Sequence, residues 1–427
     1  MRKQKFTTAA LAAGLVLTLG ACGSQAASKA SSDNLDPATT SGTLRVMIPT
    51  YPVSNAGKDA FQKVVDEFHK TWPKLNIEPD FVTYNNMNEK ISTSIASGSG
   101  YDVLVTGVGW IQPFAAKGVF KDLGTVGVTK QTVSDGTVDA LVPAVTYEDK
   151  VYGYPLVADA RVVALRKSAF VEAGLDPSKP PQNMAELKAD AEKLTKRDAS
   201  GAITRPGFDF YAKPGAYRQA FTWFLASTGT PLYTSDGKPN FANDHGVQTI
   251  NWMKNMVNNV EDFGKQNAAG QPLVYTGEAA MGFTTASVDC SDKGVGQKNC
   301  DDMEYFLLDN GSPSEFVGGD IASIGSKTKY SKAAWDFIKA LTTPEAGQAQ
   351  AALNNKIPAS RAAANSAAVQ ANPLSKFVTA NLSHAVYEGG AKNWLEVRNS
   401  FNTALDEAVL GKRPAKDVLD ALAAQSK

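Results

Sequence analysis

Val151-Tyr152-Gly153-Tyr154-Pro155 is the stretch at which the order of predicted elements changes along this 427-residue chain. On its N-terminal side, β-rich segments alternate with amphipathic segments in the order strand, helix, strand, helix, strand. Strands separated in this way pair in parallel, because each helix carries the chain back across the sheet. We therefore predict an α/β domain with strands at 43–49, 76–82 and 101–105 and helices at 57–71 and 87–96.

An α/β pattern resumes after this stretch, which predicts a crossover into a second domain. About 385 residues follow the N-terminal segment, which is more than a single hydrophobic core usually serves. Ile321-Ala322-Ser323-Ile324 is expected to return to the first domain. The other predicted elements are strands at 162–165 and 279–283 and helices at 167–173, 184–195, 217–227, 246–260, 331–341, 393–410 and 415–424.

Several crossings between two α/β domains predict a two-lobed fold with a hinge and a central cleft, each lobe being a sheet flanked by helices. The N-terminal lobe is expected to contain residues 43–153 and 320–365. The C-terminal lobe is expected to contain residues 154–319 and 366–427. A ligand that contacts both lobes across such a cleft would favour the closed form.

The first residues predict export and anchoring. A basic start is followed by a short apolar run that ends in Leu19-Gly20-Ala21-Cys22, which matches a bacterial lipobox. We expect residues 1–21 to be a signal peptide, Cys22 to carry lipid, and residues 22–42 to be a flexible Ser- and Ala-rich tether. This predicts attachment to the extracellular face of a bacterial cell membrane through lipid alone. An ordinary signal peptide with a chance cysteine is the alternative.

Charge and cysteine content narrow the class of protein further. Lys plus Arg equals Asp plus Glu, at 43 each, and no long basic block is present, which argues against nucleic acid as a partner. Cys290 and Cys300 flank a polar, glycine-containing loop, which favours a disulfide in an exported protein. Two free thiols are the alternative. The spacing of these cysteines fits no zinc pattern, and no cofactor is expected.

Several motifs, in order, resemble those of the extracellular solute-binding proteins of family 1, which include the maltodextrin-binding protein. The resemblance covers nearly the whole chain after the lipobox. It departs at Asn183-Met184, where an aromatic residue is usual, and in the loop from Cys290 to Cys300. The matching segments are Tyr101-Asp102-Val103-Leu104 with Trp110, Val151 to Pro155, Phe170 to Leu175, Gly277-Glu278-Ala279-Ala280-Met281, and Ala334 to Ile338 with Thr342 to Glu345 and Ile357-Pro358-Ala359.

This resemblance implies a type II periplasmic-binding-protein-like fold and a monomer that serves as the substrate-binding component of an ABC importer. It would capture a carbohydrate, which we expect to be an oligosaccharide, and deliver it to permease subunits in the membrane. Sugar rings stack on aromatic side chains, and their hydroxyls need fixed donors and acceptors. Ligands of open α/β sheets bind beyond the carboxyl ends of strands.

The residues predicted to contact ligand follow strands, carry aromatic or polar side chains, or match family positions. The resemblance places a ligand-contacting carboxylate at Asp159, a stacking tryptophan at Trp394 and a cleft-lining segment at 284–287. The predicted set is Tyr51, Tyr84, Asn85, Thr106, Trp110, Asp159, Thr284, Ser287, Gly319, Asp320, Trp394 and Arg398.

Each of the main candidates has a structural alternative. Trp110 and Trp394 could pack in the core, and Tyr51 and Tyr84 could be ordinary loop aromatics. Asp159 could instead form a structural ion pair with Arg161.

Competing functions stay open at this point. A surface-anchored glycan-active enzyme would need two carboxylates at a set distance. No nucleophile elbow or phosphate loop is present, and His69, His245 and His384 lack metal-ligand spacing, so we expect no enzyme. The same fold could instead bind a polyamine, a metal ion, a phosphate ester or a peptide. A ferric site would use paired tyrosines such as Tyr51 and Tyr84. A surface adhesin without transport is a further competing function.

Overall fold

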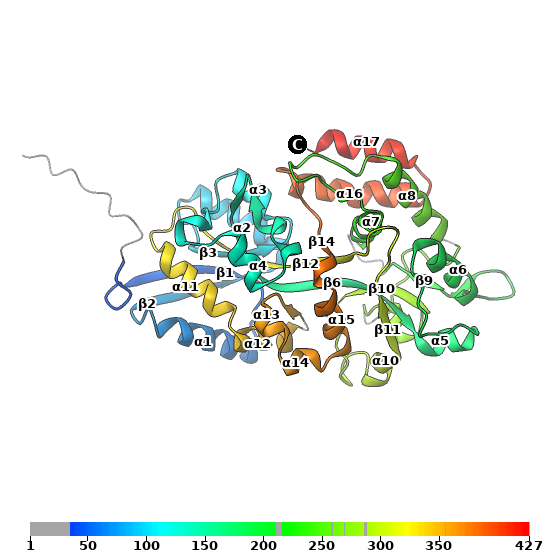
Figure 1. Cartoon of the computed structure of the whole chain (residues 1–427), viewed down its shortest axis with the longest axis horizontal. Coiled ribbons are helices and arrows are strands. Elements are labelled where there is room, and N and C mark those ends of the chain that lie inside the picture. The colour runs from blue at the N-terminus through cyan, green and yellow to red at the C-terminus, as the bar shows by residue number, and fades with distance from the viewer. Residues whose placement is uncertain are drawn as a thin grey trace, which may run out of the picture.

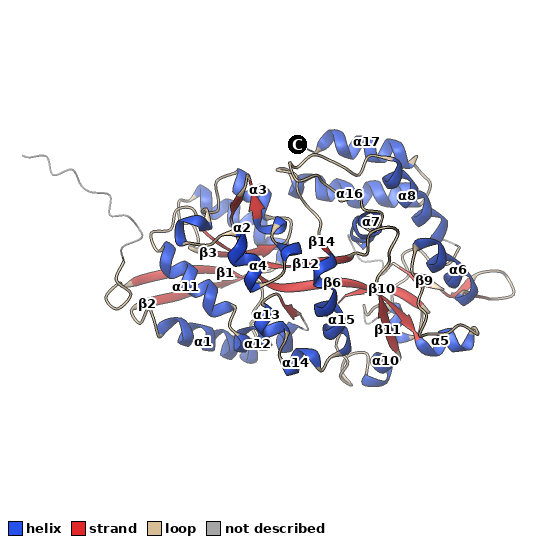
Figure 2. Cartoon of the chain, in the orientation of Figure 1, coloured by secondary structure: helices blue, strands red, loops and turns tan. Residues whose placement is uncertain are grey.

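Two α/β lobes lie side by side in the computed structural model, and the predicted two-lobed α/β fold is confirmed (Figure 1). The structure describes residues 35–210, 216–257, 259–268, 270–285, 288–354 and 356–426. The predicted signal peptide, Cys22 and Ser287 lie outside the described residues. Helices cover both sides of a central layer of strands (Figure 2).

The central layer is a ten-stranded sheet that runs through both lobes. In the N-terminal lobe, β1 pairs in parallel with β2 and β3, as the alternation of strands and helices predicts. The main path of the sheet is β2-β1-β3-β12-β6-β10-β9. These strands are β1 (Gly42–Ile48), β2 (Leu75–Phe81), β3 (Val103–Gly107), β6 (Tyr154–Arg166), β9 (Phe208–Asp209), β10 (Met281–Thr285) and β12 (Glu315–Ile324).

Two long antiparallel strands, β6 and β12, connect the lobes. Tyr154 and Val157 of β6 belong to the hydrophobic core of the N-terminal lobe, and Val163 and Leu165 belong to that of the C-terminal lobe. The expected strand at 162–165 is therefore only the end of a 13-residue strand. Because the chain passes between the lobes within continuous strands, the expected lobe boundaries after residues 153 and 319 coincide with the start of β6 and the interior of β12.

Helices of the N-terminal lobe pack an apolar stripe onto the sheet. In α1, Ser54 caps the first turn by accepting from the Gly57 amide. Phe61, Val64, Val65 and Phe68 are spaced to share one face of this helix, and all four are buried. The rings of Phe61 and Phe68 lie 6.2 and 5.5 Å from that of Phe337 in α11. The main helices of this lobe are α1 (Asn55–His69), α2 (Tyr84–Ala96), α3 (Ile111–Ala116), α4 (Lys130–Gly136), α11 (Ser331–Leu341) and α12 (Pro344–Asn354).

The C-terminal lobe has a separate core rich in aromatic rings. Trp223 is fully buried there, and its indole N–H donates to the Ser314 carbonyl at 2.6 Å. Asn183 caps α6 by accepting from the Glu186 amide. The helices are α5 (Lys167–Glu172), α6 (Met184–Leu194), α7 (Ala216–Ala226), α8 (Asp244–Met256), α9 (Leu273–Thr276), α10 (Gln297–Asp301), α16 (Trp394–Val409) and α17 (Ala415–Gln425).

Shorter elements complete the fold around the two connecting strands. β13 pairs with β6, and β14 pairs in parallel with β12. These elements are β4 (Thr146–Tyr147), β5 (Lys150–Val151), β7 (Lys196–Arg197), β8 (Ile203–Arg205), β11 (Met303–Phe306), β13 (Ile357–Pro358), β14 (Ala385–Val386), α13 (Arg361–Ala364), α14 (Ala367–Gln370) and α15 (Pro373–Asn381).

The predicted disulfide between Cys290 and Cys300 is present, with 5.9 Å between the two Cα atoms. It closes the loop that follows β10. Across the described part of the chain, no helix has both the length and the apolar character needed to cross a bilayer.

Candidate ligand-binding site

Between residues 158 and 162, the two faces of β6 carry opposite kinds of side chain. Side chains alternate along a strand, and Ala158, Ala160 and Val162 belong to an apolar cluster with Leu374 and Val378 of α15. Asp159 and Arg161 therefore point to the other face. We call that face, where the two connecting strands pass between the lobes, the hinge face.

Asp159 and Arg161 form the ion pair that the sequence left open as an alternative to ligand contact. Arg161 Nη1 lies 2.8 Å from Asp159 Oδ1, and Arg161 Nε donates to Gln219 Oε1 of α7 at 3.0 Å. The Asp159 and Arg161 side chains are 23% and 16% exposed, so both can still be reached from solvent. Contact of Asp159 with ligand stays a prediction.

A second, more deeply buried ion pair joins β12 to the segment before β13. Lys356 Nζ lies 2.5 Å from Asp320 Oδ2, and the Asp320 side chain is fully buried. Burial acts to lower the pKa of the Lys356 ammonium, but the carboxylate of Asp320 outweighs this and raises it above its ordinary value. Within the described part of the chain, Asp320 Oδ1 has no hydrogen-bond partner.

Two aromatic residues of the N-terminal lobe lie beside this pair. The Tyr84 and Trp110 rings meet edge to face with their centroids 6.2 Å apart, and Lys356 Nζ lies 5.9 Å from the centre of the Tyr84 ring. Gly107, which pairs with Asp320 across the sheet, makes room for them. A Cβ atom at position 107 would lie 3.2 Å from the Tyr84 ring. Three predicted contact residues and Lys356 therefore meet here.

The remaining N-terminal candidates are placed differently. Tyr51 is 1% exposed and packs edge to face against Phe61, 5.3 Å away, so the structure puts it in the core rather than on the hinge face. Burial of Tyr51 raises its pKa to about 12. Thr106 is fully buried, one residue before Gly107 and hence on the opposite face of β3. Asn85 is exposed in the first turn of α2, next to Tyr84.

The C-terminal lobe adds a buried cluster of two arginines around one carboxylate. Arg218 of α7 binds Glu388 at both oxygens, with Nε 2.6 Å from Oε2 and Nη2 3.1 Å from Oε1. Arg398 of α16 lies at 3.3 Å from Oε1 through its Nε. Burial acts to raise the pKa of Glu388, but the two guanidinium groups outweigh it and hold the pKa below its ordinary value.

Trp394, expected to stack on ligand, is fully buried where the two lobes touch. A Cβ atom on Gly109 would lie 2.5 Å from the Glu388 carbonyl oxygen and 3.1 Å from Trp394 Nε1. A Cβ atom on Gly389 would lie 2.7 Å from the Gly109 Cα. The lobes therefore touch through Gly109 and Gly389, next to the Trp394 side chain. The Trp394 indole N–H has no partner among the described residues.

Two more candidates lie within strands. Thr284 of β10 is fully buried. Gly319 of β12 has a φ of 135°, and a Cβ atom there would lie 2.0 Å from the Val157 carbonyl oxygen, so this position requires glycine. The Gly319 carbonyl accepts from the Val108 amide at 2.9 Å.

A large cleft between the lobes is lined by none of the predicted contact residues that the structure describes. It has a volume of about 990 Å³ and is lined by residues of the N-terminal lobe between 112 and 149 and of the C-terminal lobe between 222 and 237 and between 385 and 392. Three tyrosines, Tyr147, Tyr233 and Tyr387, line it. Tyr233 also packs edge to face against Trp394, 5.9 Å away, so this cleft adjoins the contact between the lobes.

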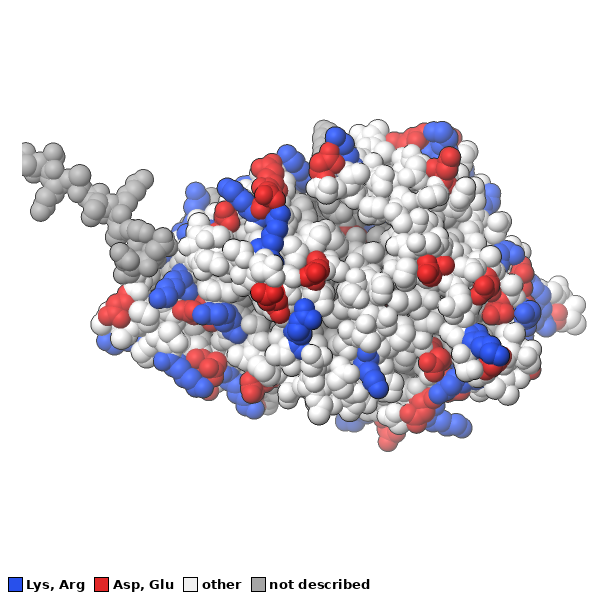
Figure 3. Space-filling view, viewed as in Figure 1, with Lys and Arg blue, Asp and Glu red and all other residues white. Residues whose placement is uncertain are grey.

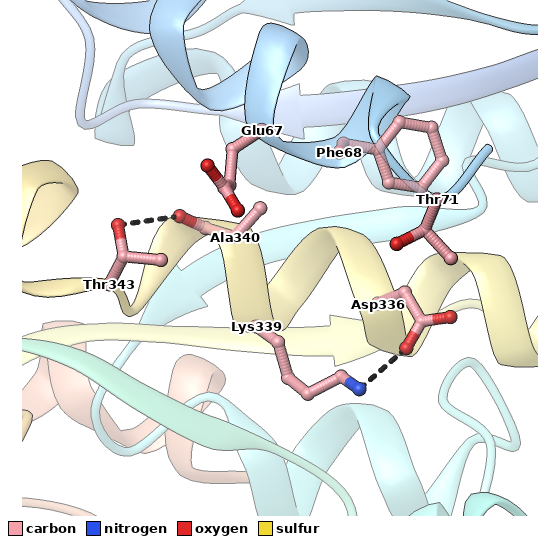
Figure 4. A pocket seen from close by; sticks show the side chains of 7 residues that line it. All are labelled: Glu67, Phe68, Thr71, Asp336, Lys339, Ala340 and Thr343. Atoms are coloured by element: carbon pink, nitrogen blue, oxygen red, sulfur yellow. Dashed lines mark hydrogen bonds and ion pairs between the residues drawn. The ribbon is translucent and has the colours of Figure 1, made fainter. Parts of the chain in front are cut away.

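A smaller depression of about 200 Å³ lies between α1 and α11 in the N-terminal lobe (Figure 4). Asp336 and Lys339 form an ion pair at 2.6 Å in it, and Asp336 also accepts from the indole of Trp72. Both charged groups are thus held by their neighbours, and none of the predicted contact residues described by the structure lines this depression.

We use the name hinge region for the hinge face together with the neighbouring charged cluster of Arg218, Glu388 and Arg398. Four charged residues of this region are absent from the sequence-based prediction of ligand contacts: Arg161, Arg218, Lys356 and Glu388. The sequence points to Arg161 only as an ion-pair partner of Asp159. The other three lie on α7, before β13 and after β14, and no motif links them. Only folding brings them together, so no sequence signal pointed to them.

A two-lobed α/β fold whose connecting strands present a polar face beside aromatic rings defines a solute-binding protein. Residues 53–348 match the model of the bacterial extracellular solute-binding protein family, and the chain belongs to that family. Proteins of Brucella abortus named as binding proteins are 23% identical over 216 residues, 51% of this chain and 50% of theirs. The chain thus spans about half the length of the curated relatives it matches.

Solved structures share the whole fold. The cyclic alpha-maltosyl-1,6-maltose binding protein of Arthrobacter globiformis superposes with a TM-score of 0.73 at 18% identity, covering 90% of this chain and 98% of that one. CpMnBP1 with mannotriose bound gives 0.70 at 23% identity, covering 90% and 100%. UgpB of Mycobacterium tuberculosis, in complex with glycerophosphocholine, gives 0.70 at 17% identity, covering 90% and 98%.

Proposed function

We propose that this protein captures a carbohydrate outside a bacterial cell and delivers it to the membrane permease of an ABC importer. The observation that carries the proposal is the position of Tyr84 and Trp110 beside the ion pair of Asp320 and Lys356 on the hinge face. Aromatic rings suit the apolar faces of a sugar, and charged donors and acceptors suit its hydroxyls.

Two of the similar structures support a sugar ligand, since one is a maltosyl-maltose binding protein and the other holds mannotriose. The UgpB structure holds glycerophosphocholine, so a phosphate ester is the main alternative. Both ligand types would meet the same cations on the hinge face.

Polyamines and ferric iron fit the site less well. A polyamine would need an excess of carboxylates, whereas the hinge region has four cations, Arg161, Arg218, Lys356 and Arg398, against three carboxylates, Asp159, Asp320 and Glu388. A ferric site built on Tyr51 and Tyr84 is disfavoured, because Tyr51 packs in the core. Among the described residues, no group of three or more His, Cys, Asp or Glu is placed to hold a metal ion.

An enzymatic role is also disfavoured. Glycoside hydrolysis needs one carboxyl group that donates a proton and a second that acts as base or nucleophile. Asp159, Asp320 and Glu388 are each paired with a lysine or an arginine. The two guanidinium groups hold the pKa of Glu388 below its ordinary value, which opposes proton donation by this residue. Burial raises the pKa of Asp320, but the Asp320 carboxylate is the ion-pair partner of Lys356.

Acidic and basic residues are interspersed over the visible surface without a large patch of one sign (Figure 3). This distribution argues against nucleic acid as a partner. Lipid attachment at Cys22 and a monomeric state complete the proposal. Mass spectrometry of the membrane-extracted protein would test the lipid, since a Cys22→Ala variant should lack the diacylglycerol mass.

A thermal-shift screen tests the proposed ligand class. The purified protein is heated with neutral oligosaccharides, acidic oligosaccharides, phosphate esters, polyamines and peptides. A ligand that binds only the folded state raises the melting temperature. A shift with oligosaccharides, and recovery of the sugar unchanged, is the expected result. Shifts confined to polyamines or peptides would overturn the carbohydrate proposal while keeping the fold.

A further inference from the structure

The charged residues of the hinge region form one connected set that reaches both lobes. Lys356 lies close enough to Asp159 and Arg161, besides its partner Asp320, for their charges to act on its pKa. Arg161 in turn acts on the pKa of Glu388, after Arg218 and Arg398. The set therefore continues from the N-terminal lobe, along β6 and β12, to α7 and α16 of the C-terminal lobe.

Positive charge exceeds negative charge in this set. Its four cations share three carboxylates, and most of the side chains are largely buried: Arg218 is 3% exposed, Glu388 8%, Arg161 16% and Lys356 18%. An uncompensated charge in such surroundings is costly, because little water solvates it. An anion bound beside the set would therefore be stabilised.

The surplus positive charge is concentrated on Arg398. Both oxygens of Glu388 are already bound by Arg218, in the geometry of a two-point guanidinium–carboxylate pair. Arg398 approaches the same carboxylate only through Nε, at 3.3 Å. Within the described residues, its two terminal amino groups make no ion pair, and its side chain is 32% exposed. A guanidinium with a free edge is well suited to a planar carboxylate or a phosphate.

The position of Arg398 agrees with a role beside a sugar ring. It follows Trp394 by four residues in α16, so the two side chains lie on the same side of the helix, one turn apart. Trp394 is the residue expected to stack on ligand, and it lies at the contact between the lobes. Opening of the Gly109–Gly389 contact would expose both side chains to an incoming ligand.

We propose that the ligand is a glycan carrying an anionic group, a carboxylate or a phosphate, which binds the free edge of the Arg398 guanidinium. This inference rests on the proposed function and narrows its substrate class. The sugar ring would lie against the aromatic residues, and the anionic group would compensate the surplus charge of the hinge region.

Isothermal titration calorimetry tests this with three matched glycans: a neutral oligosaccharide, the same oligosaccharide ending in a uronic acid, and the same one ending in a phosphate. The protein should bind one anionic form at least about 10-fold more tightly than the neutral form, as expected for a charge-assisted pair. The preference for the uronic acid or the phosphate identifies which anion the site takes. Added salt should weaken binding of the anionic form only.

Arg398→Gln should remove this preference, so that affinity for the anionic form falls to about that for the neutral form. Arg413→Gln is the matched control, because Arg413 also pairs with a glutamate, Glu407 at 3.1 Å, just beyond the end of α16. Arg398→Lys keeps the charge without the guanidinium edge and should retain part of the preference. If Arg398→Gln has a lowered melting temperature, the binding comparison is made with Arg398→Lys instead.

Three results would overturn the inference. Equal affinity for neutral and anionic glycans would refute it while leaving the proposed function intact, as would an equal loss of both in Arg398→Gln. Failure of all three glycans to bind, with a polyamine or peptide bound instead, would refute the proposed function as well.

Discussion

The two faces of β6 show how one strand can serve both stability and recognition. Ala158, Ala160 and Val162 face an apolar cluster beneath α15, whereas Asp159 and Arg161 face the region between the lobes. The apolar face holds the connecting strands against a helix, and the charged face is the one proposed to contact ligand. The difference arises because alternate residues of a strand point in opposite directions.

Placing a charge on the apolar face should have the largest effect. Ala160 is fully buried. Ala160→Asp would bury a carboxylate without a partner and should destabilise the fold by about 4–5 kcal/mol or prevent folding. Urea unfolding monitored by circular dichroism measures this. Asp159→Ala, one residue away, should cost much less, and similar losses in both variants would contradict the distinction between the faces.

Breaking the buried ion pair of the hinge face should have the next largest effect. Lys356→Met would leave Asp320 charged, fully buried and without its cation. Removal of one partner from a buried pair costs about 3–5 kcal/mol. Because protonation of Asp320 relieves that cost, the variant should regain stability as the pH is lowered. The double variant with Asp320→Leu should recover much of the loss, and no recovery would show that the ion pair is not the cause.

Measurements of ligand affinity should distinguish the hinge face from the large cleft as the place where ligand binds. Trp110→Ala on the hinge face should weaken ligand binding by about 10- to 100-fold, because a stacking ring is lost. Tyr147→Ala, in the large cleft, should leave affinity nearly unchanged. Calorimetry with the ligand found in the thermal-shift screen measures both. The opposite outcome would place the ligand in the large cleft.

Crowding the contact between the lobes at Gly109 should have the smallest effect. It should destabilise the arrangement in which the lobes touch by about 1–3 kcal/mol. Gly109→Ala puts a Cβ atom 2.5 Å from the Glu388 carbonyl oxygen, so the lobes should move apart and Trp394 should become exposed. Small-angle scattering and tryptophan fluorescence report these changes. Gly118→Ala is the control, since Gly118 has a similar positive φ with no atom within 4 Å. Equal effects would attribute the change to backbone strain alone.

Much of the fold could be predicted because its signals are local. The buried stripe of α1 follows from helical spacing, and the Asn183 cap and the Cys290–Cys300 disulfide follow from residue type and context. The continuity of β6 could not be predicted in this way. Its 13 residues show no strict alternation of apolar and polar side chains. Pairing with β12 over residues 154–161 and with β10 and β11 over residues 161–166 makes them a single strand.

The candidate site was harder to predict from the sequence. Trp110, Asp159 and Asp320 follow or occupy strands; Trp110 packs against Tyr84, and Asp320 and Asp159 lie near Lys356. Tyr51 also follows a strand, yet packs against Phe61, because an aromatic side chain near a core can turn inward at little cost. Which of these positions touch ligand stays a prediction, and Ser287 lies outside the described residues.

The sequence by itself determined the two α/β lobes, the family and the aromatic and polar residue types near the strand ends, because these depend on periodicity and short motifs. The tertiary structure alone decided that Arg161, Arg218, Lys356, Glu388 and Arg398 share one charged region, and that the lobes meet at Gly109 and Gly389. Contacts such as those of Arg218 with Glu388 and of Gly109 with Gly389 join residues far apart in the sequence, and electrostatic interactions depend on distance in space rather than along the chain.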